Sequence, residues 1–328
     1  MGEKLMSLEG LRVSFKIADK YFAAVDDVHL DIMKNETFAV VGESGCGKSA
    51  MALSILRLHD LNFTRIEGSI IFNEEDLAAM TEKELYKIRG EEVGMIFQDP
   101  LTSLNPLHRI GRQLEETMLY HRAMSASERR ARALELLEDV GIPNPALTYE
   151  SFPHELSGGM RQRIVIAIAL SCEPALLIAD EPTTALDVTI QAQILDLIRA
   201  LKDKVQSSVM LITHDLGVVA EMADRVAVMY AGQIVELASV EEIFHNPLHP
   251  YTRSLLASMP SNAAGNRLST IQGAVPTLMN LPREGCRFMH RIPWMDSSVH
   301  EEEPTLREVS EGHFVRCTCY KKFHFQEG

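Results

Sequence analysis

The stretch G-E-S-G-C-G-K-S at residues 42–49 constrains this chain more than any other. An apolar run, 38–41, precedes it, and a segment typical of a helix, 50–58, follows it. G-x-x-x-x-G-K-[ST] between a strand and a helix is the context in which this pattern binds nucleotide phosphates. Its glycines let successive backbone N–H groups turn toward phosphate oxygens, and the helix start adds partial positive charge. The stretch therefore predicts a nucleoside triphosphate site rather than a glycine-rich turn without a ligand.

Two side chains of this loop have distinct predicted roles. Lys48 reaches the terminal phosphates as a point charge, and Ser49 places its hydroxyl on Mg²⁺. Cys46 is either a small filler side chain or a thiol whose alkylation blocks nucleotide binding. The nucleotide-binding residues predicted here are Gly42, Glu43, Ser44, Gly45, Cys46, Gly47, Lys48, Ser49 and Ala50.

Composition narrows the class of protein. The chain has 328 residues and 46% apolar residues, enough for a nucleotide-binding domain with a sizeable core. A net charge of −14 has the wrong sign for binding nucleic acid by phosphate neutralisation. No apolar run approaches the ~20 residues of a membrane-spanning helix, and the N-terminus lacks a secretory core. Five cysteines without an export signal indicate a reducing cytosol.

Residues 8–32 alternate apolar and polar side chains, as antiparallel strands with one buried face do. We expect Tyr21 and Phe22 in the turn between two such strands. An aromatic side chain there either stacks on an adenine base or is an ordinary surface residue.

Further strands and a short helix are predicted after the loop, at 66–72, 82–88 and 93–97. Gln98 then stands at the carboxyl end of a strand, beside a turn-rich loop at 101–106. Ligands bind at that edge of open α/β sheets. Gln98 is accordingly a candidate ligand contact or a solvated side chain.

The periodicity becomes helical between residues 110 and 140. The pattern Ser125-x-x-Glu128 is a capping box, which starts a helix with one apolar face. This block interrupts the α/β pattern and is predicted to be a subdomain of its own.

Three later stretches carry candidate site residues. Ser157-Gly158-Gly159 opens an apolar helix, which makes it a second anion site or an ordinary N-cap. The apolar run 175–179 leads to Asp180, suited to Mg²⁺, and Glu181, suited to deprotonate water. A further strand, 209–212, leads to His214, which is a structural, surface or catalytic histidine.

Taken in order, these motifs resemble the ATP-binding subunit of an ABC transporter over approximately residues 5–260. The motifs are the phosphate loop, the Gln98 loop, L-S-G-G-M-R-Q-R at 156–163, L-L-I-A-D-E-P at 176–182, A-L-D at 185–187 and His214. The resemblance implies an α/β fold: a P-loop NTPase core with a RecA-like parallel sheet, an antiparallel β subdomain, an inserted helical subdomain and a small C-terminal extension. We expect the ATPase domain at 1–258, its helical subdomain at about 99–155, and the extension at 259–328.

The resemblance also implies roles and partners. Glu181 is the general base, Gln98 senses Mg²⁺ and the attacking water, and His214 contacts the γ-phosphate. Ser157, Gly158, Gly159 and Asp187 serve ATP held by an opposite subunit. ATP and Mg²⁺ are the expected cofactors. The expected partners are two transmembrane permease subunits, a second ABC ATPase (a heterodimer, or a homodimer) and, indirectly, an extracytoplasmic substrate-binding protein, without nucleic acid. The expected location is peripheral, at the cytoplasmic face of the membrane.

Several strings look like those of the dipeptide/oligopeptide importer branch, including F-Q-D-P-L-T-S-L-N-P at 97–106 and N-P-L-H-P-Y-T at 246–252. The resemblance implies ATP-driven import of peptides, with nickel or another metal complex as the alternative cargo. A soluble ABC ATPase acting on nucleic acid or ribosomes, and a regulatory ATP binder without turnover, are rivals of another class. One cassette, no long heptad run, an acidic balance and the intact Gln98, Glu181 and His214 argue against them.

The tail departs from that branch, in which many relatives carry four cysteines able to hold an iron–sulfur cluster. Only Cys286 and Cys317 match; the other two positions fall on Ile292 and at about Val299, and Cys319 is additional. Three thiolates fit a four-cysteine cluster poorly, so we do not expect one. Either the tail holds no metal, or Cys286, Cys317 and Cys319 bind zinc with one of His290, His300 and His313.

Overall fold

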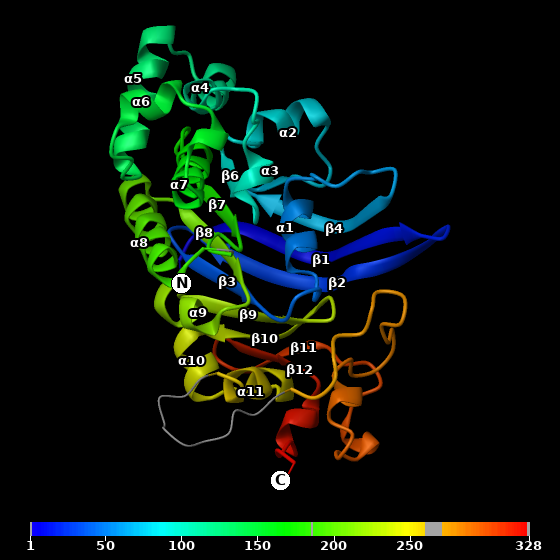
Figure 1. The fold of residues 1–328 in the computed structure, drawn as a ribbon. Helices are drawn as coiled ribbons and strands as arrows, with labels where there is room; N and C mark the ends of the chain where they lie inside the picture. The colour runs from blue at the N-terminus through cyan, green and yellow to red at the C-terminus, as the bar shows by residue number, and fades with distance from the viewer. Residues whose placement is uncertain (1, 185, 260–270, 327–328) are drawn as a thin grey trace. The chain divides into compact units, whose positions relative to one another are not determined.

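The computed structural model describes residues 2–184, 186–259 and 271–326 (Figure 1). It contains two compact units. The phosphate-loop unit comprises 4–31, 38–78 and the chain from 213 onward. The helix-rich unit comprises 79–212 with short segments before residue 4 and at 32–37. Within the described residues, no helix is long and apolar enough to cross a membrane.

The phosphate-loop unit begins with a four-stranded sheet in the order β2-β1-β4-β5. In β1, alternating residues such as Leu11 and Val13 are buried, which is why this stretch forms a strand with one core face. β4 pairs antiparallel with both β1 and β5. The bounds are β1 Lys4–Ile17, β2 Lys20–Met33, β4 Thr64–Phe72 and β5 Glu75–Asp76.

A second set of strands in this unit contains β3, the strand that leads into the phosphate loop. β3 (Thr37–Val41) is buried at every position and pairs parallel with β9 (Arg225–Tyr230). β10 (Gln233–Ser239) pairs antiparallel with β9 and carries the chain toward its C-terminal part. The helices of this part are α1 Lys48–Ile55, α9 Leu216–Met222, α10 Val240–His245 and α11 Pro250–Ala257.

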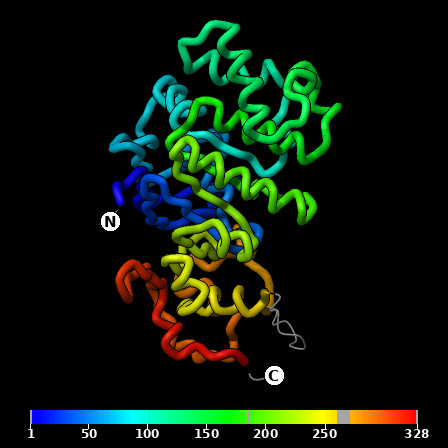
Figure 2. The backbone as a smooth tube through the Cα atoms, turned by 90° about the vertical axis from the view of Figure 1, so that its left-hand side faces the viewer, coloured from blue at the N-terminus to red at the C-terminus, as the bar shows by residue number. Residues whose placement is uncertain are grey.

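The C-terminal segment continues the same sheet. β12 (His313–Arg316) pairs antiparallel with β10 through Glu236 and Val315, and β11 (Leu306–Ser310) pairs with β12. Three single-turn 3₁₀ helices, Met289–Arg291, Ser297–Val299 and Thr318–Lys321, hold the remaining chain. Arg253 of α11 donates to the Phe323 carbonyl at 3.4 Å, and the last described residues, up to 326, follow in red in Figures 1 and 2. The tail is thus built into the unit that carries the phosphate loop.

The helix-rich unit contains three parallel strands, β6 (Val93–Ile96), β7 (Leu176–Asp180) and β8 (Ser208–Thr213). β7 and β8 are buried along their whole length, as strands of parallel sheets are. The other elements are α2 Glu82–Ile88, α3 Pro100–Ser103, α4 Ile110–His121, α5 Ala126–Asp139, α6 Pro145–Glu150, a 3₁₀ turn at Pro153–Glu155, α7 Gly158–Ala169 and α8 Val188–Val205.

Helices α4, α5 and α6 pack together, as Figure 1 shows. The predicted capping box starts α5: the Ser125 side chain accepts from the Glu128 N–H, and the Glu128 carboxylate accepts in return. α4 and α6 approach closely because Gly111 has no Cβ, which would lie 2.3 Å from the Tyr149 ring. These three helices therefore pack around a small shared core, and the predicted subdomain bounds of about 99–155 stay a prediction.

Four local predictions were wrong. Tyr21 and Phe22 belong to β2, because Ala18 and Asp19 form the turn at φ +47° and +63°. The first helix starts at Lys48 and ends at Ile55, because Arg57 takes φ +48° and cannot continue it.

The other two concern the stretch around Gln98. β6 ends at Ile96 and leaves Phe97 outside the strand. The loop predicted at 101–106 begins inside α3, since Pro100 fits the first turn of a helix.

Candidate nucleotide site

The phosphate loop is shaped by two glycines that packing requires and one that faces open space. A Cβ on Gly42 would lie 2.1 Å from the Met229 carbonyl oxygen, and one on Gly47 would lie 2.6 Å from that of Ala24. Gly45, at φ +79°, has nothing within 4 Å of its Cβ position. The loop thus presses its back against the unit and leaves backbone exposed at its tip, which fits a phosphate cradle.

Lys48 is held inside this loop. Its ammonium donates to the carbonyl oxygens of Gly42 at 2.7 Å and Glu43 at 3.1 Å, and its residue is 4% exposed. Gly47 gives α1 no side-chain cap, so the helix start offers N–H groups to an anion. Burial raises the pKa of the Cys46 thiol, an effect that Lys48 partly offsets, so the neutral thiol is the favoured form at neutral pH.

Tyr251 of α11 and Arg291 lie far from the loop in sequence and both contact Glu43. The Tyr251 hydroxyl accepts the Glu43 N–H at 2.8 Å. Arg291 donates to the Glu43 carboxylate at 2.5 and 3.3 Å, and to the carbonyls of Gln272 and Gly273. Burial opposes the Arg291 charge, yet its bonds to Glu43 prevail and raise its pKa. Sequence reasoning missed both residues.

The H-P-Y-T segment positions Tyr251. Pro250 opens α11 and His249 caps it, accepting the Tyr251 N–H at 3.1 Å through Nδ1. Burial lowers the pKa of His249 to about 4, which keeps that nitrogen unprotonated as an acceptor. The buried Glu236 carboxylate accepts the backbone N–H of His249 at 2.9 Å and lies 2.8 Å from His313 Nε2.

In the helix-rich unit, the side chains of Glu181 and Gln98 are hydrogen-bonded to each other. Gln98 Nε2 donates to Glu181 Oε2 at 2.9 Å, and the Thr184 hydroxyl donates to the same oxygen at 2.8 Å. Glu181 follows β7 at φ +48°, a conformation that non-glycine residues adopt mainly where surroundings enforce it. Thr184 was missed by sequence reasoning, because a threonine in a turn has no distinguishing pattern.

Asp180 ends β7 and is 4% exposed. Asp187 caps α8, accepting the Ile190 N–H at 3.0 Å. In the phosphate-loop unit, His214 follows β8 and is exposed. These positions keep the predicted side chains at strand ends and a helix start, where ligands bind in such folds.

The second predicted anion site is the start of α7. The Ser157 hydroxyl accepts the Met160 N–H at 3.3 Å, so the predicted N-cap is present. A Cβ on Gly158 would have nothing within 4 Å. The helix start is therefore open at Gly158, whereas a Cβ on Gly159 would lie 3.3 Å from the Ile190 side chain.

Tyr21 lies in β2 with the Arg65 guanidinium 3.7 Å from its ring centroid. One face of the ring is thereby covered by a cation–π contact. Stacking of Tyr21 on adenine stays a prediction.

Comparison with known proteins places these features in a family. The ABC transporter family model matches residues 25–184, and that of the oligopeptide/dipeptide transporter C-terminal region matches 235–295. The chain is 50% identical over 327 residues to the oligopeptide transport ATP-binding protein OppD of Lactococcus lactis subsp. cremoris (strain SK11), covering 99% of this chain and 97% of that one. The chain belongs to the ATP-binding proteins of ABC transporters.

Further relatives of this ABC ATPase agree. The oligopeptide transport ATP-binding protein AppD of Bacillus subtilis (strain 168) is 50% identical over 320 residues, covering 97% of each chain. The ATP-binding cassette MJ0796, in a dimeric post-hydrolysis state bound to ADP and Pi, superposes with a TM-score of 0.65 at 30% identity. That match covers 72% of this chain and 99% of the other. The predicted family and P-loop NTPase fold are confirmed.

Proposed function

We propose that this chain is the ATP-hydrolysing subunit of an importer of di- and oligopeptides, acting through separate membrane subunits. The observation that carries the proposal is end-to-end identity of 50% with proteins named for oligopeptide transport, together with the matching C-terminal region. The region that matches the oligopeptide/dipeptide transporter C-terminal model, 235–295, contacts the phosphate loop through Tyr251 and Arg291.

In this proposal Glu181 is the general base of hydrolysis. Its carboxylate accepts hydrogen bonds from Gln98 and Thr184, which fix it without neutralising it. A carboxylate held in this way can orient a water molecule and take its proton. Gln98, beside it, is the side chain we assign to sensing Mg²⁺ and the attacking water.

ATP is assigned to the phosphate loop of residues 42–50. The open Gly45 tip, the uncapped start of α1 and the buried Lys48 support phosphate binding there. Ser49, Asp180 and Gln98 supply the oxygen atoms that Mg²⁺ prefers and are its proposed ligands. The ion would neutralise phosphate charge during hydrolysis.

A second ABC ATPase completes the proposed engine. The α7 start at Ser157, Gly158 and Gly159, with Asp187, is assigned to ATP bound by the partner, and His214 to the γ-phosphate. MJ0796, a related cassette, forms a dimer. We favour a heterodimer, with a homodimer as the alternative.

We assign membrane docking to the helical subdomain, about 99–155, of an ATPase domain at 1–258. Leu107, Leu119 and Tyr120 are 82%, 53% and 60% exposed there, more apolar surface than a solvated face requires. Two permease subunits are the proposed partners, with an extracytoplasmic binding protein acting indirectly. The proposed location is the cytoplasmic face of the membrane.

Transport in cells tests the function. We would delete the gene in the organism that carries it and measure uptake of a labelled tetrapeptide, complementing with wild type, Glu181→Gln or Glu67→Gln. Glu67 is an exposed residue of β4 and makes the same chemical change away from the site. Uptake is expected to return with wild type and Glu67→Gln only.

Two outcomes contradict parts of the proposal. Unchanged peptide uptake after deletion, with lost accumulation of radioactive nickel, would assign the cargo to a metal complex. Full complementation by Glu181→Gln would reject hydrolysis at this residue as the source of energy.

A further inference from the structure

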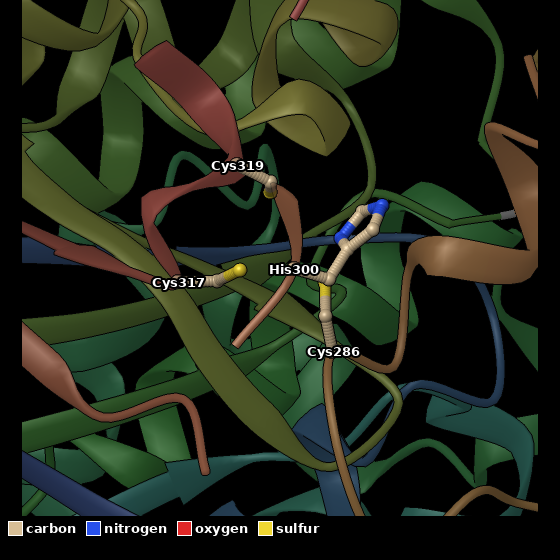
Figure 3. Close-up of side chains that lie close together, drawn as sticks. All are labelled: Cys286, His300, Cys317 and Cys319. Carbon is tan, nitrogen blue, oxygen red and sulfur yellow. The ribbon is translucent and has the colours of Figure 1, made fainter. Parts of the chain in front are cut away.

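Four side chains able to ligate a metal meet in the C-terminal segment. The Sγ atoms of Cys286, Cys317 and Cys319 and a ring nitrogen of His300 all lie within 4.8 Å of one another. Figure 3 shows the three thiols and the imidazole around a common space. The cysteines are 6%, 2% and 0% exposed, and none forms a disulfide.

Separate parts of the segment deliver these groups. Cys286 follows Gly285, whose N–H donates to the Glu302 carbonyl at 2.9 Å and whose φ is +71°. His300 ends the 3₁₀ turn Ser297–Val299. Cys317 leaves β12 at φ +67°, and Cys319 lies in the next 3₁₀ turn. Three chain segments therefore converge on one point.

The imidazole of His300 lacks hydrogen bonds of its own among the described residues. Both ring nitrogens are buried, and neither has a hydrogen-bond partner among the described residues. Leaving a buried polar group without a partner is destabilising, because its hydrogen bonds to water are lost and not replaced. Of the other two histidines near the cysteines in sequence, His313 bonds Glu236 and His290 is exposed. A metal ion would satisfy the imidazole of His300.

We propose that Cys286, Cys317, Cys319 and His300 bind one zinc ion as a structural site. Zinc takes four sulfur and nitrogen ligands in a tetrahedron, with Zn–S near ~2.3 Å and Zn–N near ~2.1 Å, so neighbouring ligand atoms stand about 3.5–3.8 Å apart. The observed limit of 4.8 Å needs only small side-chain movements to reach this. On binding, thiols lose their protons to solvent and the neutral imidazole donates its lone pair.

An iron–sulfur cluster fits less well. In a four-iron cluster each ligand binds a different iron, so the ligand atoms surround a larger body than a single ion. The positions where relatives have their other two cysteines hold Ile292, which is buried in the apolar core, and a residue near Val299. The site therefore suits one tetrahedral ion.

The ion would have a mechanical consequence for the nucleotide site. Cys286 and Arg291 are joined by the short stretch that forms the 3₁₀ turn Met289–Arg291. Between them, the Phe288 ring packs edge-on against the Tyr230 ring, with 5.2 Å between the ring centroids. Both rings belong to the apolar core that contains Tyr251. Zinc bound at Cys286 would therefore restrain the stretch 286–291, in which Arg291 contacts Glu43.

Metal analysis of the full chain tests the proposal. We would purify it under reducing conditions, dialyse it against zinc and then against buffer, and measure metals by mass spectrometry. We expect one zinc per wild-type chain. Cys319→Ala and His300→Ala are expected to lower zinc affinity by more than about 100-fold, because outer-shell changes alone cost up to that much. Cys172→Ala, a buried thiol elsewhere, and His290→Ala should retain it.

Measurements on His300→Cys and on the wild type test the zinc site even if an alanine variant misfolds. His300→Cys should restore one zinc per chain, since a four-cysteine set also binds zinc. In wild type, cobalt should give the visible spectrum of a tetrahedral thiolate site, and thiol modification should release one zinc. Iron with acid-labile sulfide, a Cys317–Cys319 disulfide after reducing purification, or zinc equally retained by Cys319→Ala and His300→Ala would overturn the proposal.

Discussion

The phosphate loop and the start of α7 are both glycine-rich helix starts, but they differ in how closely the rest of the chain packs around them. Around the loop, Gly42 and Gly47 press against neighbouring backbone, and Glu43 is held by Tyr251 and Arg291. At α7, Gly158 faces open space and the Ser157 cap is local. The phosphate loop is therefore held by contacts from its own chain, whereas a Cβ built on Gly158 would have no neighbour within 4 Å.

The difference explains how one chain can carry two anion sites with separate tasks. A loop braced from behind holds its N–H groups in place before a ligand arrives, which lowers the cost of binding. An open helix start binds weakly alone and gains strength when an anion is presented by another molecule. We expect binding to depend on the loop and assembly to depend on α7.

The largest loss of ATP affinity should come from Lys48→Ala. Its ammonium is the buried cation of the braced loop, and removing one partner of such a charge contact costs about 2–5 kcal/mol. ATP affinity, measured by calorimetry, should fall at least about 30-fold. Lys83→Ala, which removes an exposed lysine of α2, is the control. Equal affinity of wild type and Lys48→Ala would remove the phosphate assignment.

Glu181→Gln should separate binding from turnover. An amide cannot accept the proton of water, so turnover should drop by about 10²–10⁴-fold while ATP affinity changes little. Light scattering of this variant, alone and with the second ATPase encoded beside it, reports the ATP-dependent dimer. A dimer formed only with the neighbour supports the heterodimer; one formed alone supports the homodimer. Normal steady-state turnover would sink the general-base assignment.

Paired glycine changes test the comparison directly. In Gly47→Ala the new Cβ meets the Ala24 oxygen at φ +110°, which costs about 1–2 kcal/mol for the left-handed backbone alone. The protein should unfold earlier in urea and bind ATP more weakly. Gly158→Ala has open space and should leave both properties unchanged. Equal losses in the two variants would show that α7 is as constrained as the loop.

Sequence patterns predicted the parts of this site that are local. The phosphate loop, both halves of the α5 capping box and the strand end at Asp180 depend on residues within a few positions of each other. Tyr21 was misplaced because Ala18, which is no typical turn residue, takes a positive φ. Propensity cannot predict such a choice when packing of the flanking strands makes it.

Contacts over long separations lay beyond those patterns. Arg291 is 248 residues from Glu43, and Tyr251 is 208 residues from it. The cysteine spacing left three histidines open as ligands, and only the fold brings His300 to the thiols. An arginine or histidine in a tail carries no sign of its partner, since its role is set by where the sheet places it.

Arg291→Ala should have a moderate effect, because Glu43 is 30% exposed and water replaces part of the lost contact. We expect a loss of about 1–2 kcal/mol in unfolding free energy and a reduction of ATP affinity of up to about tenfold. Glu43→Gln alone and combined with it completes a double-mutant cycle. Additive losses would show that the two residues do not act together.

The smallest effect concerns Cys46, whose reactivity reports how tightly the loop is closed. Burial raises the pKa of this thiol, so little thiolate exists at neutral pH, and the residue is 1% exposed. Alkylation in the folded protein should be at least about tenfold slower than for free cysteine at pH 7.5, and should rise with pH beyond 9. Peptide mass spectrometry measures this rate, with urea-unfolded protein as the control. Rapid labelling of the folded chain would mean that the loop opens without ATP, and the bracing by Tyr251 and Arg291 would then be too weak to hold it closed.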